Sequence, residues 1–412
     1  MRPPETIANL DGFTGRGAGT DAERRAAAWL RRQLDTRSDG AGSRRTARLE
    51  PFWCRPNWAL AHASHAGLGV VGSLVSRASP QIGAGLVLAA LLSIVVDALT
   101  GLSLGRLLSR ERASQNVVSE AELEPPRDDL VHLVITANYD AGRCGLVHRD
   151  ALRRPVAWLA RASGRLAPGW LSWVCIALMW LSVVALLRAE GHGGTALDVI
   201  QLVPTVGLLL AFALLLELAT SDFSPAAGDN GSGVAAAIAL GLALDAAPPH
   251  RMSVELVLQG AGDGEGIGLR EYLRSRKHVR QSANTVALGF AACGGGRPRW
   301  WVSDGALIPC RYGKELRTIC AAVAQEDAEP GPRPHRGRGH TPALRARWAR
   351  LPAIALGCLD ELGVAARAHQ TSDTPQAVSL EAIDQAVEFG LQLVDRLDAM
   401  LARRAKERIT QA

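Results

Sequence analysis

Polar and acidic residues stand directly after several apolar runs of the chain, where strands are expected to end or a helix to begin. They are Asp140 after 131–137, Asp229 in the turn 228–233, Asp263 after 253–258, and His369 in the loop 368–375. In open α/β sheets, ligands bind at the carboxyl ends of strands, so these side chains are candidates for one binding site. The alternative is purely structural, because turns use the same residue types and a carboxylate at a helix N-terminus is stabilised by free N–H groups.

The order of these motifs resembles the zinc aminopeptidases of metallopeptidase family twenty-eight, the bacterial leucyl aminopeptidase type. The match rests on Asp-Asn-Gly-Ser-Gly at 229–233, on His369 followed by Asp-Thr-Pro at 373–375, and on the spacing of Gly268 and Tyr272. It covers the whole body outside the apolar stretches. The resemblance implies two zinc ions that share a bridging carboxylate, with a separate Glu that takes the proton from metal-bound water.

Carried over position by position, the resemblance implies that Asp229 is the bridging carboxylate and His369 a histidine ligand. The ligand Glu of the family falls on Asp263, one methylene shorter. At the second zinc, the family's His falls on Asn138 and its Asp on Ala291, and neither is a credible zinc ligand. Asp229, Asp263 and His369 could therefore hold one zinc ion, and a two-zinc centre is not expected.

The position of the general base is occupied by Gly262, which cannot transfer a proton, although Asp140 is retained. A register shifted by two would offer Asp263 as the base and Glu265 as a ligand, but it breaks the spacing from Gly268. The single-zinc glutaminyl cyclases share this fold and would also need the missing Glu. We therefore expect an inactive binding or regulatory module for an unknown protein or peptide ligand. The alternative is an active metal-dependent aminopeptidase or hydrolase with a single or rearranged zinc site.

Strand and helix patterns alternate along the body of the chain. A capping box at 20–23 predicts a helix to about Leu34, and a stripe of apolar residues predicts a long helix from Leu380. The expected strands are 47–53, 116–118, 131–137, 253–258, 285–291 and 353–356. This alternation predicts an α/β fold with a mainly parallel sheet flanked by helices.

Four apolar stretches of nearly bilayer-spanning length interrupt this body. They pair as two helical hairpins, at 58–104 and 167–218, the first weakened by His62 and His65. We expect an integral membrane protein with about four transmembrane helices. The remaining segments form one peptidase-like domain: 1–57, 105–166 and 219–412.

Charge places the body in the cytoplasm, at the cell membrane. Arginines such as Arg48, Arg106 and Arg153 flank the hairpins on the side of the body, while the turns carry Arg77 and Arg188. The seven scattered cysteines also favour a reducing compartment. The abundance of arginine reflects coding bias, so no nucleic-acid partner is expected. The arginine-rich segment 331–338 is predicted to be a solvated basic loop, with contact to anionic lipid as the alternative.

Overall fold

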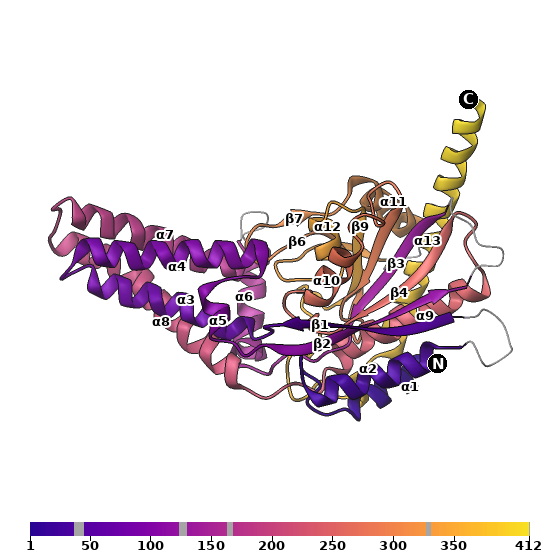
Figure 1. The fold of residues 1–412 in the computed structure, drawn as a ribbon, viewed down its shortest axis with the longest axis horizontal. Coiled ribbons are helices and arrows are strands. Elements are labelled where there is room, and N and C mark those ends of the chain that lie inside the picture. Colours follow the sequence, from indigo (N-terminus) through magenta and orange to yellow (C-terminus); the bar gives the residue numbers. More distant parts are fainter. Residues whose placement is uncertain (37–44, 123–129, 163–167, 327–330, 412) are drawn as a thin grey trace.

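The computed structural model contains one mixed β-sheet, and a helical bundle projects from the body that surrounds it (Figure 1). The structure describes residues 1–36, 45–122, 130–162, 168–326 and 331–411. The strands of the sheet follow the order β1-β2-β4-β3-β5-β9-β6-β7, and β8 pairs with β6. Their bounds are β1 Arg45–Cys54, β2 Arg112–Ala121, β3 Val131–Asn138, β4 Met252–Gln259, β5 Thr285–Phe290, β6 Arg297–Asp304, β7 Cys310–Arg311, β8 Arg333–Arg336 and β9 Ala353–Leu359.

The centre of this sheet is parallel and its two sides are largely antiparallel. β3 pairs in parallel with β4 and β5, and β5 with β9. The pairs β1/β2, β2/β4 and β6/β9 are antiparallel. The prediction of a mainly parallel sheet is therefore wrong. It overlooked β6 to β8, whose arginines and prolines hide the strand pattern. The prediction also did not take into account that β1 and β2 lie before and after the first apolar segment. The chain therefore returns to the sheet in the opposite direction, and β2 pairs antiparallel with β1.

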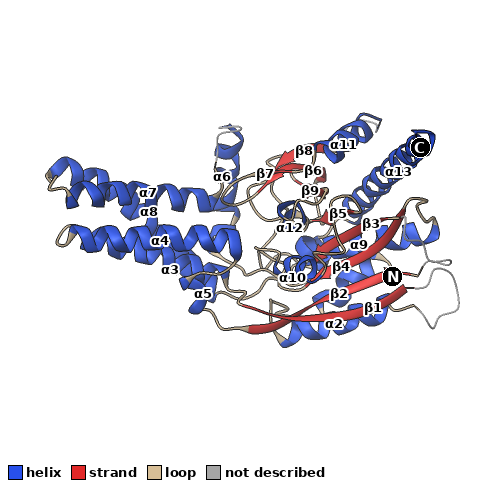
Figure 2. Ribbon diagram, turned by 45° about the horizontal axis from the view of Figure 1, so that its top comes forward, coloured by secondary structure: helices blue, strands red, loops and turns tan. Residues whose placement is uncertain are grey.

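Helices cover both faces of the sheet (Figure 2). On one face α9 packs against β3, β4 and β5, with α1 and α13 beside it, while α10 and α12 lie on the other. α2 begins after Thr20, whose hydroxyl accepts a hydrogen bond from the Glu23 amide at 3.2 Å, which confirms the predicted start of this helix. The bounds are α1 Pro3–Asp11, α2 Asp21–Leu34, α9 Ser232–Ala246, α10 Ile267–Ser275, α11 Lys314–Glu326, α12 Leu344–Trp348 and α13 Leu380–Gln411.

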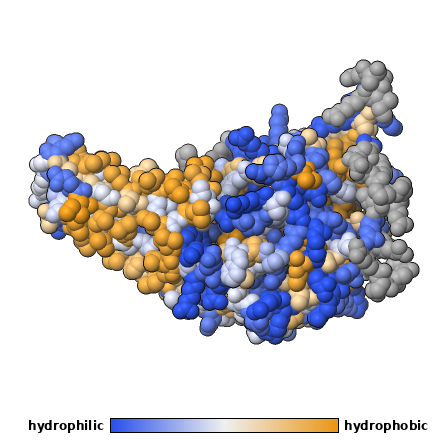
Figure 3. Space-filling view, in the orientation of Figure 1, coloured by the Kyte–Doolittle hydropathy of each residue, from blue (hydrophilic) through white to orange (hydrophobic). Residues whose placement is uncertain are grey.

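The projecting bundle consists of α3 Trp58–Val75, α4 Pro80–Thr100, α7 Trp170–Ala189 and α8 Thr195–Thr220 (Figure 1). Each of α3 and α7 contacts both α4 and α8. Small residues let the helices approach closely: a Cβ atom added to Gly69 would lie 2.4 Å from Cδ2 of Leu178. The outer surface is apolar, and polar side chains gather at the far tip (Figure 3), where Arg188 pairs with Asp198 at 2.5 Å.

Three helices of the described chain, α4, α7 and α8, are long and apolar enough to cross a membrane. α3 does not belong to this group, although the sequence predicted four such helices. The two-hairpin arrangement across a membrane stays a prediction, and the expected boundary at 166–167 lies outside the described residues.

The short helix α6, Asp150–Ala162, lies across the direction of the bundle where the bundle joins the body (Figures 1 and 2). Its arginines turn to the body, where Arg153 donates to the Ala365 carbonyl at 3.0 Å and Arg161 to the Glu361 carbonyl. The opposite face is apolar and uncovered by described residues. Its large side chains are Leu152, Val156, Trp158 and Leu159, which are 48%, 66%, 63% and 62% exposed.

Candidate metal site

Asp229, Asp263 and His369 converge beside the carboxyl ends of the central parallel strands. Their potential ligand atoms all lie within 4.8 Å of one another. Nε2 of His369 is 3.5 Å from Oδ2 of Asp229 and 3.7 Å from Oδ1 of Asp263. Oδ2 of Asp229 is buried and accepts no hydrogen bond from a described residue. The structure thus brings together the three predicted ligands, and their role as ligands stays a prediction.

Asp140 lies just beyond β3 and holds the loop that carries Asp263. Its carboxylate accepts hydrogen bonds from the amides of Gly262 at 2.9 Å and Asp263 at 3.2 Å. The Asn230 side chain donates to the Asp140 carbonyl at 2.7 Å and to Oδ1 of Asp263 at 3.3 Å. Burial, with the negative charges of Asp263 and Glu23, raises the pKa of Asp140 well above its usual range. Asp140 is therefore a positioning residue for the cluster.

Glu23 supports the same loop from α2. Its carboxylate accepts hydrogen bonds from the Ala261 amide at 3.0 Å, from Oγ of Ser114 at 2.7 Å and from the Gly19 amide at 2.6 Å. Burial raises the pKa of Glu23 to about 7. The sequence assigned this Glu to a capping box, and the spacing gave no sign of a partner so distant in the chain.

Arg16, fully buried, joins the segment after β3 to the segment that leads to Asp229. Its guanidinium donates to the carbonyls of Tyr139 at 3.0 Å, Pro225 at 2.6 Å and Ala226 at 2.8 Å. Burial lowers the pKa of Arg16 to about 10, which leaves it charged at neutral pH. Sequence reasoning missed this residue, because a single arginine in a glycine-rich segment carries no recognisable pattern.

Asp373 fastens the His369 loop to the turn that carries Asp229. Its carboxylate accepts hydrogen bonds from the amides of Gly228 at 2.7 Å and Asp229 at 3.1 Å. Burial and the charge of Asp229 raise the pKa of Asp373 to about 7. His369 itself has a φ of +58°, a backbone conformation that residues other than glycine adopt at a cost.

His148 is a site residue that the sequence did not reveal. Its ring stacks on the ring of His369, with centroids 4.3 Å apart and planes 17° from parallel. Its Nε2 atom is buried without a hydrogen-bond partner among described residues. Burial, with the charges of His369 and Arg153, lowers the pKa of His148 far below its usual value, so the ring is neutral. It lies in a one-turn helix, Leu146–His148, and no motif marks it.

The three positions at which the sequence was predicted to depart from the family that it resembles are Asn138, Gly262 and Ala291, and they lie close to the cluster. A Cβ atom added to Gly262 would lie 2.3 Å from Oδ1 of Asn138, so the Asn138 side chain fills the space a base at position 262 would need. Oδ1 of Asn138 is buried and has no described hydrogen-bond partner. Ala291, just beyond β5, lines the cavity beside Asp229. The group that the described residues form here contains no second histidine and no glutamate.

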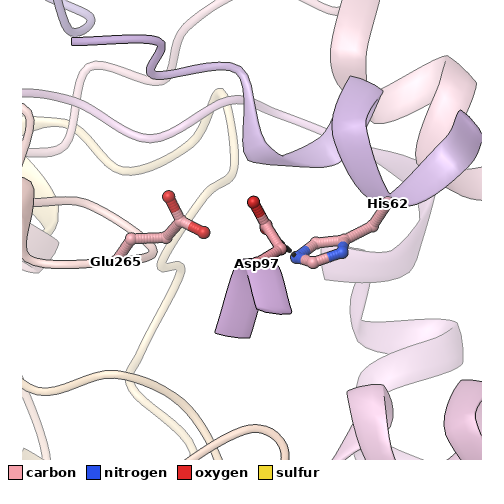
Figure 4. Close-up of side chains that lie close together, drawn as sticks. All are labelled: His62, Asp97 and Glu265. Atoms are coloured by element: carbon pink, nitrogen blue, oxygen red, sulfur yellow. Dashed lines mark ion pairs between the residues drawn. The ribbon is translucent and has the colours of Figure 1, made fainter. Parts of the chain in front are cut away.

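Glu265, the ligand of the shifted register, is engaged elsewhere. Figure 4 shows it beside Asp97 of α4 and His62 of α3. Arg106, which follows α4, donates from Nε to Asp97 at 2.9 Å and also pairs with Glu265. Because a guanidinium stands between the two carboxylates, this second group is an ion-pair network rather than a metal site.

A cavity of about 420 Å³ connects the cluster with the base of the bundle. Asp229, Asp263 and His369 supply acidic and imidazole groups on its wall. Its apolar lining comes from the bundle and from a loop after β6, through Trp58, Ala98, Trp170, Leu171 and Leu307. A ligand here would therefore meet polar groups at one end and side chains of the apolar helices at the other.

Comparison with known proteins relates this fold to bacterial aminopeptidases. The structure is similar to a zinc aminopeptidase from Bacillus subtilis, with a TM-score of 0.52, 12% identity and coverage of 96% of this chain and 94% of that one. An aminopeptidase from Aneurinibacillus sp. strain AM-1 gives a TM-score of 0.54, 12% identity and coverage of 95% and 92%.

A Bacteroides thetaiotaomicron glutaminyl cyclase bound to N-acetylhistamine is also similar, with a TM-score of 0.50, 10% identity and coverage of 95% and 96%. No family model and no curated protein matches the chain. At such identities the likeness shows the fold alone, which is aminopeptidase-like. Because a cyclase has it too, the fold does not decide the reaction.

Substituting Gly142→Ala should disturb the cluster, since the added Cβ would lie 2.1 Å from the His369 ring and 2.7 Å from Oδ2 of Asp263. We expect a loss of about 1–3 kcal/mol in unfolding free energy, the usual cost of overpacking. Gly339→Ala is the control, because a Cβ there meets nothing within 4 Å. Thermal unfolding of both variants measures the difference. Equal stability of the two would contradict the described packing of Gly142.

Proposed function

We propose that this chain is a membrane-anchored protein of aminopeptidase-like fold, catalytically inactive toward peptides, that acts as a binding or regulatory module. The observation that carries this proposal concerns the position of the general base. The residue there is Gly262, and the side chain of Asn138 occupies the space beside it. A base that takes a proton from the attacking water typically contributes about 10²–10⁴-fold to the rate. Neither a glycine nor an amide side chain can accept that proton.

One zinc ion fits the remaining cluster. Asp229, Asp263 and His369 provide two carboxylates and one imidazole, the donor set that zinc takes in proteins, with a fourth position left for water or a ligand. Oδ2 of Asp229, which accepts no hydrogen bond from a described residue, would be available to such an ion. Zinc would supply Lewis-acid polarisation of a bound oxygen. Asp140 and Asp373 would hold the ligand loops through their amides, while His148 orients the His369 ring by stacking.

The ligand that suits this cavity is the amino-terminal end of a protein or peptide. An uncharged amino group could take the position left open beside the zinc ion, and the indole rings of Trp58 and Trp170 offer apolar surface for the side chains of the peptide. Binding without cleavage would leave such a partner intact at the membrane surface.

The membrane is the second partner in this proposal. α4, α7 and α8 support insertion by their length and composition. α6 supports it independently, because an amphipathic helix with arginines on one side and Leu152, Val156 and Trp158 on the other suits the bilayer interface. By the positive-inside rule, the arginines beside the bundle support a cytoplasmic position of the body.

A second candidate function is hydrolysis by a single-zinc site. The convergence of Asp229, Asp263 and His369 favours it, since a metal could activate water in part without the usual base.

Purified protein should contain about one zinc ion per chain, because one three-ligand site remains. His369→Ala should abolish this binding, whereas His278→Ala, at an exposed histidine, should not. Elemental analysis and zinc titration of the two variants give the comparison. A content of about two zinc ions per chain would contradict the loss of the second site.

Aminoacyl-arylamide hydrolysis by the unaltered chain should be absent or marginal. Gly262→Glu alone should not restore it, because the new side chain meets Asn138 and one metal position stays without ligands. The triple variant Asn138→His, Gly262→Glu and Ala291→Asp supplies all three missing groups and should raise turnover. Turnover by the unaltered chain that a chelator and His369→Ala both remove would favour the hydrolase instead.

Reporter fusions test the membrane orientation. A reporter that is active only in the cytoplasm should give a signal at the carboxyl end of the chain and none when inserted near Gly193, at the tip of the bundle. The reverse pattern would place the body outside the cytoplasm.

A further inference from the structure

A basic pocket of about 430 Å³ lies between α6 and the strands β6 and β8. It adjoins the cavity of the candidate metal site, with which it shares His335, Arg338 and Gly363. Five arginines from three parts of the fold line it: Arg161 of α6, Arg299 of β6, Arg333 and Arg336 of β8, and Arg338 just after β8. The prediction of a loop at 331–338 is wrong, because the segment includes the strand β8, although Arg333 and Arg336 are solvent-exposed as predicted.

Arg299 is the buried centre of this group. It is only 9% exposed, and its Nε atom has no hydrogen-bond partner among described residues. Its Nη2 atom makes one long contact, 3.4 Å from the Asp360 carbonyl. A buried N–H of a charged group without an acceptor is costly, so this position calls for an anion.

The neighbouring positive charges also favour a bound anion. Arg299 and Arg333 are direct partners in the parallel β6/β8 pair, where like charges destabilise a sheet. Burial, together with the charges of Arg333, Arg161 and Arg297, lowers the pKa of Arg299, and Glu361 offsets only part of this. Burial, Arg299 and Arg338 lower the pKa of His335 to about 4, so it adds no charge at neutral pH.

Acidic groups in the pocket do not balance these arginines. Among the described lining residues, Glu361 alone carries a carboxylate, and its Oε1 atom lies 3.8 Å from Nε of Arg297, outside the lining. The structure gives Arg333 and Arg336 no ion pair with a described residue.

We infer that this pocket binds a phosphate group, with Arg299 at its base and Arg333 and Arg336 at its mouth. Guanidinium groups match the geometry of phosphate oxygens and donate paired, charge-assisted hydrogen bonds to them. This phosphate site is separate from the metal cluster, and it does not depend on whether that cluster binds zinc.

The phosphate can come from a lipid headgroup or from a free small molecule. Position favours the lipid, because Arg161 belongs to α6, whose opposite face exposes Val156 and Leu159 beside the apolar bundle. The experiment separates the two sources.

Isothermal titration of the full chain in a non-ionic detergent tests the site with three probes at fixed salt. They are inorganic phosphate, dihexanoyl phosphatidylglycerol and dihexanoyl phosphatidylcholine. The pocket variant is Arg333→Gln with Arg336→Gln. The control is Arg24→Gln with Arg274→Gln, which removes the same charge from side chains that are 68% and 79% exposed. Thermal unfolding checks that both variants are folded.

We expect phosphate or phosphatidylglycerol to bind the unaltered chain and the control equally, and the pocket variant about tenfold or more weakly. Phosphatidylglycerol binding more tightly than inorganic phosphate and phosphatidylcholine identifies a lipid headgroup, and equal binding of phosphate and phosphatidylglycerol identifies a free phosphate. Two results would overturn the inference. One is no binding of any probe to the unaltered chain, and the other is equal binding by the pocket variant and the control.

Discussion

The carboxylate of Asp140 accepts two amide hydrogen bonds from Gly262 and Asp263, and the geometry of the site depends on that contact. It joins the end of one central strand to the loop that follows its parallel neighbour. Asn230, on the turn that carries Asp229, then bonds to both Asp140 and Asp263. A loop rich in glycine has many alternative conformations, and these acceptors select one of them. Asp263 reaches the cluster because of that selection.

Concentrating carboxylates in this way has an electrostatic cost. Burial raises the pKa values of Asp140, Asp229 and Asp373, and nearby negative charges add to the effect. Asp263 acts on both Asp140 and Asp229, and Asp229 acts on Asp373. Arg16 is a buried cation nearby, but its guanidinium donates hydrogen bonds to backbone carbonyls. His369 gains a raised pKa, because the charges of Asp263 and Asp229 outweigh the effect of burial. The cluster therefore favours a cation, whether a proton on His369 or a metal ion.

The apolar bundle is mechanically connected to this cluster. Glu265 lies two residues beyond Asp263 and pairs with Arg106, which in turn pairs with Asp97 near the end of α4. Arg345 donates to the Glu265 carbonyl at 2.6 Å from the other side. A shift of α4 relative to the body would pull on the loop that carries Asp263. The insertion of the bundle into the domain is thus part of the construction of the site.

Local sequence patterns predicted many of the strands and helices. The other features depend on contacts between residues that are far apart in the sequence. The strand 131–137 and the helix after Thr20 appear where β-branched residues and a capping pattern placed them. β6 could not be recognised, because its pairing with β9 rather than its composition makes it a strand. The convergence of Asp229, Asp263 and His369 was expected from their places at strand ends and turns and from the family resemblance. The roles of Arg16 and His148 did not, since each depends on partners brought close only by the tertiary fold.

We propose that this aminopeptidase-like fold keeps one metal position and lacks the other. X-ray absorption at the zinc edge, on protein loaded with one equivalent of zinc, tests this most directly. We predict a spectrum with one imidazole and otherwise oxygen neighbours, and without a second metal at about 3.5–4 Å. A zinc–zinc distance in that range, or scattering from more than one imidazole, would contradict the account.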